Sequence, residues 1–219
     1  SASLQNENPF DAELPAIPAE VIPLKNGATI RPSLYGASSY GDLMIDRQTL
    51  SFIRLARTIR DIGDELIKNG NSLEYARGLV GYAGAQLARK LKYSTRGATL
   101  YVGNQQVDHI FVNESTVAFS YDSFEVGIGS GPGTWDSITE SGISTLRGLM
   151  DGLGGTPSRV MTGTATSLPF RDDSLTAVVT DPPYDAMVYY SDSSDLFYSW
   201  LKRSLGGLYP ELAVSADTR

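Results

Sequence analysis

Apolar side chains recur with a helical period in the first half of the chain. Between Asp46 and Asn69 they fall every three or four residues, at Phe52, Leu55, Ala56, Ile59, Ile62, Leu66 and Ile67. This spacing places them on one face of an α-helix. Asp46 is a suitable N-cap for that helix, and Gly70 is a suitable residue to end it.

A second helix is predicted over residues 72–92. Its apolar stripe is followed by basic residues, which suit a helix C-terminus. Three glycines at a spacing of three, Gly78, Gly81 and Gly84, lie within it. Because glycine lowers helix stability, we expect these glycines where another part of the chain packs closely against the helix.

The pattern on either side of these helices is less regular. Residues 1–33 are rich in Pro, Asn and Glu and show no period, which predicts an extended arm. Alternating apolar residues predict strands at 106–112 and 115–119. The capping-box sequence Ser137–Glu140 predicts the start of a third helix that ends near Leu149.

Helix and strand signals alternate towards the C-terminus. Short apolar runs predict buried strands at 158–162 and 175–180, and a last helix is expected over 194–204. This order of elements predicts an α/β fold. The expected organisation has three parts, namely an extended arm at 1–33, a helical segment at 34–100 and an α/β segment at 101–219.

Composition removes several classes of chemistry. The 219 residues include no Cys and one His, His109, which excludes thiolate chemistry, Cys-based metal sites and a multi-His metal site. No run approaches the roughly 18 to 20 apolar residues that a membrane helix needs, and no signal peptide is visible. We therefore expect a cytoplasmic protein with neither a membrane partner nor a metal.

The charge is unevenly distributed. The formal net charge is −7, yet residues 46–100 carry ten basic residues against five acidic ones. This segment could face nucleic-acid phosphates, or it could be a helix pair whose basic side chains are simply solvated. The sequence leaves both interpretations open.

The sequence Asp181-Pro182-Pro183-Tyr184 follows the apolar run 175–180 directly. Open α/β sheets bind ligands at the carboxyl ends of their strands. Two prolines remove two N–H donors and stiffen the backbone, so carbonyl oxygens and the Asp181 carboxylate are available as acceptors. Tyr184 adds a ring on which a base can stack. The four residues together suit an exocyclic amine on a flat heterocycle, and a base must leave the duplex to reach them.

Asp-Pro-Pro-Tyr after an apolar strand resembles the catalytic motif of amino-directed DNA methyltransferases. The flanks extend the resemblance to a group of large prokaryotic adenine-specific DNA methylases, some of which sit beside phage-defence genes, which implies a role in restriction-modification or phage defence. The flanking matches are the Leu-Pro-Phe sequence at 168–170, the stretch 190–203 and, more weakly, Tyr40–Met44. The resemblance covers most of residues 34–212.

That resemblance implies a partial class I, Rossmann-like methyltransferase sheet with a helical segment N-terminal to it. It implies S-adenosyl-L-methionine (AdoMet) as cofactor, DNA as partner and Asp181, Pro182, Pro183 and Tyr184 as the catalytic residues. Gly163 and Thr164 match the family's cofactor-binding Gly-acidic pair, although Thr164 replaces the acidic residue. In the family, the glycine-rich AdoMet loop lies near the N-terminus of a longer chain, and that loop has no counterpart at this place here. The family's zinc ribbon is built from Cys residues, and this chain has none. We therefore expect a fragment, or one subunit whose missing half lies on another chain.

One glycine-rich stretch of this chain offers a substitute for the family's missing AdoMet loop. Gly127, Gly129 and Gly131 follow Glu125 in the general pattern that opens a class I methyltransferase fold. That pattern needs a buried strand before it, and one βα unit is missing between it and Asp181. The stretch is therefore either a cofactor loop or a surface loop.

The expected function is AdoMet-dependent methylation of an exocyclic amine in DNA, with adenine N6 as the favoured acceptor, by a fragment or subunit. Two alternatives remain. The chain could be a catalytically silent, methylase-like module that binds DNA or a partner subunit, or an RNA amino-methyltransferase.

Overall fold

A computed structural model describes Leu4 and residues 6–24, 30–111, 116–127, 129–152, 154, 158–161, 163–182 and 190–212. Within this part of the chain the fold is mixed α/β, with four α-helices and one small antiparallel sheet of two strands. None of these helices combines the length and the apolar character that crossing a bilayer requires.

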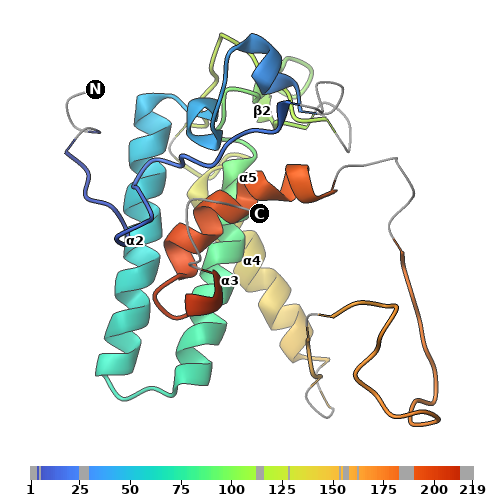
Figure 1. Cartoon of the computed structure of the whole chain (residues 1–219). Helices are drawn as coiled ribbons and strands as arrows, with labels where there is room; N and C mark the ends of the chain where they lie inside the picture. The colour runs from blue at the N-terminus through green and yellow to red at the C-terminus, as the bar shows by residue number, and fades with distance from the viewer. Residues whose placement is uncertain are drawn as a thin grey trace.

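Three helices form the centre of the molecule. They are α2 (Asp46–Lys68), α3 (Leu73–Leu91) and α5 (Tyr190–Leu205), and each packs against the other two (Figure 1). The stripe predicted for the first helix supplies core residues such as Phe52, whose ring meets Trp200 of α5 edge-on at 5.3 Å between centroids. Both N-terminal helices and the last helix are thus confirmed.

The ends of α2 and α3 largely follow the predicted signals. Gly70 has a left-handed φ of +83°, as expected for the residue that ends α2. Ser72 caps α3, because its side chain accepts a hydrogen bond from the Tyr75 N–H. The N-cap of α2 was predicted one residue too late: Ile45 holds that position and Asp46 is the first helical residue, where its charge favours the helix dipole.

The glycines of α3 allow close packing, as expected, at two of three positions. A Cβ built on Gly84 would lie 2.8 Å from Leu205 of α5, and one on Gly81 would lie 2.8 Å from the Tyr209 hydroxyl oxygen. Gly78 faces open space. Alanine at Gly84 would therefore require the Leu205 side chain to shift.

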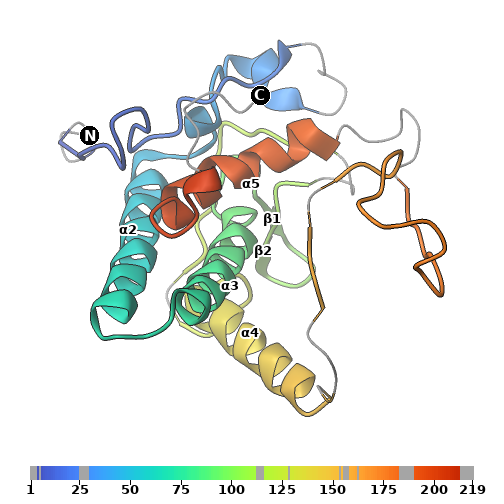
Figure 2. The same cartoon turned by 60° about the horizontal axis from the view of Figure 1, so that its bottom comes forward.

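The N-terminal arm enters the core. Leu14, Ile22 and Ile30 are buried, and so is the carboxylate of Glu20. One oxygen of Glu20 accepts hydrogen bonds from Lys202 Nζ and Arg203 Nη1 of α5, each at 2.7 Å, and all three side chains are fully buried. Figure 2 shows the arm passing α2 and running alongside α5. The sequence predicted the arm but not this ion cluster.

Basic side chains of the 46–100 segment bind other parts of the chain. Arg57 pairs with Glu7, and Arg60 pairs with Asp11 at 2.9 Å, which fastens the arm to α2. Arg77 pairs with Glu211 at 2.5 Å and lies over the Tyr209 ring. These residues therefore join elements of the fold rather than forming a free basic surface.

The small sheet is a hairpin of β1 (Thr99–Tyr101) and β2 (Gln106–Asp108), with Leu100 opposite Val107. A strand beginning at Gln106 was predicted correctly, but its partner was predicted wrongly as 115–119. Its described residues, 116–119, contribute only single bridges, from Val117 to Phe111 and to Ile30. Residues 112–115, between the described parts of the two predicted strands, lie outside the described residues.

Helix α4 (Trp135–Met150) begins earlier than predicted. Thr134 is its N-cap and accepts a hydrogen bond from the Ser137 N–H at 3.2 Å, so the capping-box reading of Ser137–Glu140 was wrong. The first half of α4 packs on α3, where the Tyr82 hydroxyl donates to the Gly142 carbonyl at 2.7 Å. The second half, from Ile143 onward, is exposed along its whole length.

The strands predicted at 158–162 and 175–180 do not form. Residues 158–161 and 163–182 are all exposed and contain only one isolated bridge, between Thr164 and Ser167. Both views show this trace running outside the helices (Figures 1 and 2). A strand needs a neighbouring strand to pair its backbone groups, and these residues have none beside them in the described structure. Thr162 lies outside the described part.

We predict that Glu20→Gln lowers the free energy of unfolding by about 3–5 kcal/mol, because two buried cations lose their counter-charge. Urea unfolding followed by circular dichroism measures the loss. Glu13→Gln is the matched control, since Glu13 lies exposed on the same arm and should change stability by less than about 0.5 kcal/mol. A loss below about 1 kcal/mol for Glu20→Gln would show that the cluster is unimportant for folding.

Candidate functional site

The predicted acceptor residues lie at the end of the uncovered segment. Asp181 and Pro182 are both exposed, directly after the apolar run 175–180. Pro183 and Tyr184 lie outside the described residues. The structure thus presents the Asp181 carboxylate to solvent rather than at the end of a paired strand.

Gly163 and Thr164 stand earlier in the same exposed segment. The Ser167 N–H donates to the Thr164 carbonyl at 3.2 Å, which closes a turn, and the Thr164 hydroxyl contacts the Thr166 hydroxyl at 2.8 Å. A Cβ on Gly163 would meet nothing within 4 Å. The Thr164 side chain thus serves its own turn.

The glycine-rich stretch before α4 has no strand in front of it. Residues 120–127 form no strand, so the pattern lacks the element that would aim it at a cofactor. Glu125 pairs with Arg47 at 3.3 Å, and the Phe124 carbonyl accepts from Gln48 at 3.3 Å, so this stretch is fastened to the start of α2. Gly127 and Gly129 face open space, and Gly131 only just touches Thr134.

The five residues expected to hold AdoMet are therefore not assembled into one cradle by the described part of the chain. Gly127, Gly129 and Gly131 precede α4 at the helical body, whereas Gly163 and Thr164 belong to the outer trace, and the two places are well separated in both views (Figures 1 and 2). On this evidence the residues present do not fit the cofactor by themselves.

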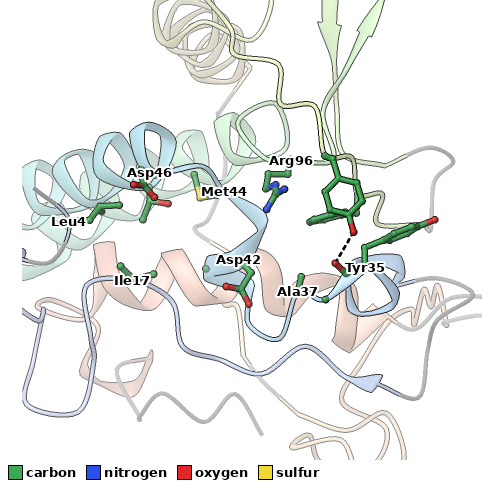
Figure 3. A pocket seen from close by; sticks show the side chains of 13 residues that line it. Leu4, Ile17, Tyr35, Ala37, Asp42, Met44, Asp46 and Arg96 are labelled. Atoms are coloured by element: carbon green, nitrogen blue, oxygen red, sulfur yellow. Dashed lines mark hydrogen bonds between the residues drawn. The ribbon is translucent and has the colours of Figure 1, made fainter. Parts of the chain in front are cut away.

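A pocket of about 340 Å³ lies elsewhere, between the arm, the turn at 35–46 and the stretch 96–121 (Figure 3). Three aromatic rings meet in its wall: Tyr35 stacks on Phe119 at 5.7 Å, and Tyr121 stands edge-on to both. The Arg96 guanidinium lies 4.7 Å from the centre of the Phe119 ring. None of the predicted site residues lines this pocket.

Asp42 forms another part of the pocket wall. Its Oδ2 accepts hydrogen bonds from the Ser38 N–H at 2.7 Å, the Ser38 hydroxyl at 2.9 Å and the Ser39 N–H at 2.8 Å. Burial by itself raises the pKa of Asp42, but these hydrogen bonds outweigh burial and leave the pKa below its usual value. The sequence carries no sign that Phe119 and Tyr121 meet Tyr35, because that contact joins residues more than 80 positions apart.

Two basic residues of the 190–203 stretch are excluded from any surface site. Lys202 and Arg203 are fully buried against Glu20, so they cannot reach a DNA phosphate. Trp200, in the same stretch, is buried in the core.

Comparisons with protein-family models, with curated proteins and with solved structures gave no match for this chain.

We predict that trypsin cleaves after Arg159 and Arg171 before it cleaves the helical body, because these residues lie in the exposed segment. Mass spectrometry of the first fragments identifies the cut sites. Arg60 and Arg203 are internal controls, since both are held by hydrogen bonds inside the fold. Early cleavage at Arg60 or Arg203 would contradict the described exposure.

We predict that Asp42→Asn destabilises the protein at pH 7 and has a smaller effect near pH 2.5. The folded-state pKa of Asp42 is lowered, so its charged form stabilises the fold above the unfolded pKa, and this contribution is lost as the pH falls through the folded pKa. Urea unfolding at both pH values measures it, and an effect of equal size at both would contradict the prediction.

Proposed function

We propose that this chain is the acceptor-side component of an AdoMet-dependent amino-methyltransferase that acts on DNA, with adenine N6 as the favoured acceptor. It works as a fragment or subunit that another polypeptide completes. The observation that carries the proposal is Asp181-Pro182, exposed and directly following an apolar run of six residues.

The chemistry of these residues supports the assignment. An exocyclic amine donates two hydrogen bonds, and the Asp181 carboxylate and the Pro182 carbonyl are two acceptors on adjacent residues. Pro182 and Pro183 lack N–H donors and restrict the backbone, which keeps those acceptors in place. Stacking of the base on Tyr184, worth about 1–3 kcal/mol, is an expectation from the sequence.

The family resemblance places this motif in a class I, Rossmann-like sheet. In the proposal, residues 175–180 become one strand of that sheet when the site is complete, and AdoMet, the methyl donor, is held mainly by the completing polypeptide. This arrangement accounts for the scattered positions of Gly127 and Gly163. A cytoplasmic role in restriction-modification or phage defence belongs to the same proposal.

A catalytically silent binding module is the second candidate. The observation that favours it is that the expected cofactor residues do not meet in the described chain. Both candidates require that this chain alone binds AdoMet weakly or not at all, so methyl transfer by the completed complex is what separates them.

Calorimetric titration of AdoMet into the purified chain is the first test, and we expect no binding up to about 1 mM. Binding in the micromolar range would contradict a site that needs a second polypeptide.

In the completed complex, we predict that Asp181→Asn lowers methyl transfer from labelled AdoMet to DNA by at least about 100-fold. The reason is that the substitution removes the charged acceptor for the target amine. Asp172→Asn, in the same exposed segment, is the matched control and should keep full activity. Equal activity of both variants would exclude the proposed role of Asp181. Inactivity of the unaltered complex on DNA and RNA would favour the silent module, and transfer to RNA alone would favour the RNA enzyme.

A further inference from the structure

We infer that the pocket walled by Tyr35, Phe119 and Arg96 binds a small aromatic carboxylate, whose carboxylate group accepts hydrogen bonds from the Arg96 guanidinium. This site contains none of the residues predicted for methyl transfer, so it stands whether or not the proposed function holds. Three features of the pocket carry the assignment: the surroundings of Arg96, the aromatic wall and the charges nearby (Figure 3).

The backbone of Arg96 is fixed between two walls of the pocket. Its N–H donates to the Leu43 carbonyl at 2.6 Å, and its carbonyl accepts from the Ser120 N–H at 2.8 Å. Leu43 ends the short helix Tyr40–Leu43, and Ser120 lies between two of the rings that line the pocket. The fold itself therefore places the Arg96 side chain at the pocket, without help from a charged partner.

The guanidinium of Arg96 lacks an acceptor within the described part of the chain. The residue is half-buried, and its Nε is buried with no hydrogen-bond partner. By contrast, Arg57, Arg60 and Arg203 each reach a carboxylate. Donors that folding removes from water without a partner cost free energy, and most buried donors in proteins have one. A ligand oxyanion in the pocket would supply an acceptor to the outer N–H groups of this guanidinium.

Aromatic rings hold the Arg96 guanidinium in place. Its Cζ lies over the Phe119 ring, 4.7 Å from the centroid, and over the Tyr121 ring at 5.9 Å. The rings attract the positive charge, but they offer no oxygen atom to the N–H donors. Adjacent N–H groups of a guanidinium suit the two oxygens of a carboxylate. Arg96 is thus held ready for such a group before any ligand binds.

The rest of the wall suits a flat, apolar body. Tyr35 and Tyr121 meet edge-on at 6.2 Å, yet Tyr35 remains 48% exposed and Tyr121 70% exposed, so both rings have surface left for a further ring. Apolar side chains also line the pocket, namely Leu4, Ile17 and Met44. The volume of about 340 Å³ lies at the small end of ligand pockets. A molecule of one or two fused rings fits this space.

The charges around the pocket favour a singly charged anion. Burial raises the pKa of Asp42, but its hydrogen bonds to Ser38 and Ser39 outweigh burial and lower it, so this carboxylate is charged at neutral pH. Asp42 and the acidic Asp46 both line the pocket with Arg96. These carboxylates repel an anion, and they repel a doubly charged phosphate more strongly than a singly charged carboxylate. The structure therefore selects a monocarboxylate over a phosphate.

The test compares indoleacetate with its neutral amide, indoleacetamide, on the purified full chain. NMR titration of the isotope-labelled protein at neutral pH gives both dissociation constants. We expect indoleacetate to bind with a Kd of about 1 mM or lower, as small ligands in preformed pockets do, with the largest shifts in amides of residues 35–46 and 96–121. Indoleacetamide and inorganic phosphate should each bind at least about 10-fold more weakly, because neither is a singly charged carboxylate on an aromatic body.

Two variants show whether Arg96 causes this preference. Arg96→Gln should weaken indoleacetate binding at least about 10-fold, so that the acid and the amide bind alike. Arg31→Gln is the matched control, since Arg31 is exposed on the short helix Arg31–Tyr35 that carries Tyr35 and lies outside the pocket lining. It should keep the preference. Circular dichroism of both variants checks that the helices are unchanged.

Equal affinity of the acid and the amide for the unaltered chain would overturn the inference, and this comparison needs no variant. No measurable binding of indoleacetate, shifts confined to other parts of the chain, or an undiminished preference in Arg96→Gln would overturn it as well. Tighter binding of phosphate than of indoleacetate would exclude the aromatic carboxylate. None of these results bears on the proposed methyl transfer, which is tested through Asp181.

Discussion

The Glu20 carboxylate, buried between Lys202 and Arg203, joins the two ends of this chain. Burying three charged groups is unfavourable unless each is paired and hydrogen-bonded. Arm carbonyls help, because Pro15 and Ile17 accept hydrogen bonds from the Arg203 guanidinium at 3.0 and 3.4 Å. Burial lowers the pKa of Arg203, while its hydrogen bond and attraction to Glu20 oppose that shift. The position of α5 against α2 and α3 therefore depends on the arm. The same holds for the first residues of α5, which follow Asp181–Tyr184 in the sequence.

The described residues divide into two parts. The closed part is the arm with α2, α3 and α5, and the open part is the described residues between Ile143 and Pro182. The arm, α2, α3 and α5 cover one another, and basic residues of the central segment are used in holding them together. From Ile143 to Pro182 the described residues are exposed. Large exposed apolar surfaces in a folded protein usually mark an interaction site. The open part is also the part that carries Asp181.

The predicted site residues do not meet in one place in the described part of the chain. Asp181 and Pro182 are exposed, the glycines predicted to hold a cofactor lie apart, and the pocket lined by Tyr35 and Phe119 contains none of these residues. That pocket is walled by rings that pack on one another and by an Asp42 whose hydrogen bonds stay within its own turn. Its construction is independent of the motif, so the chemistry suggested by the motif is better sought at the surface that residues 143–182 leave uncovered.

Helix formation was determined locally, so the sequence predicted α2 and α3 from apolar spacing, and Gly70 as the residue that ends α2. It also suggested Asp181-Pro182 as acceptors, which stays a prediction, because that inference needs only residue types in order. It could not determine whether 175–180 becomes a strand, since a strand exists only where another backbone pairs with it. The burial of Lys202 and Arg203 likewise depends on Glu20, more than 180 positions away. Periodicity along one segment carries no information about contacts between segments, and those contacts decided which predicted elements formed and which residues reached the surface.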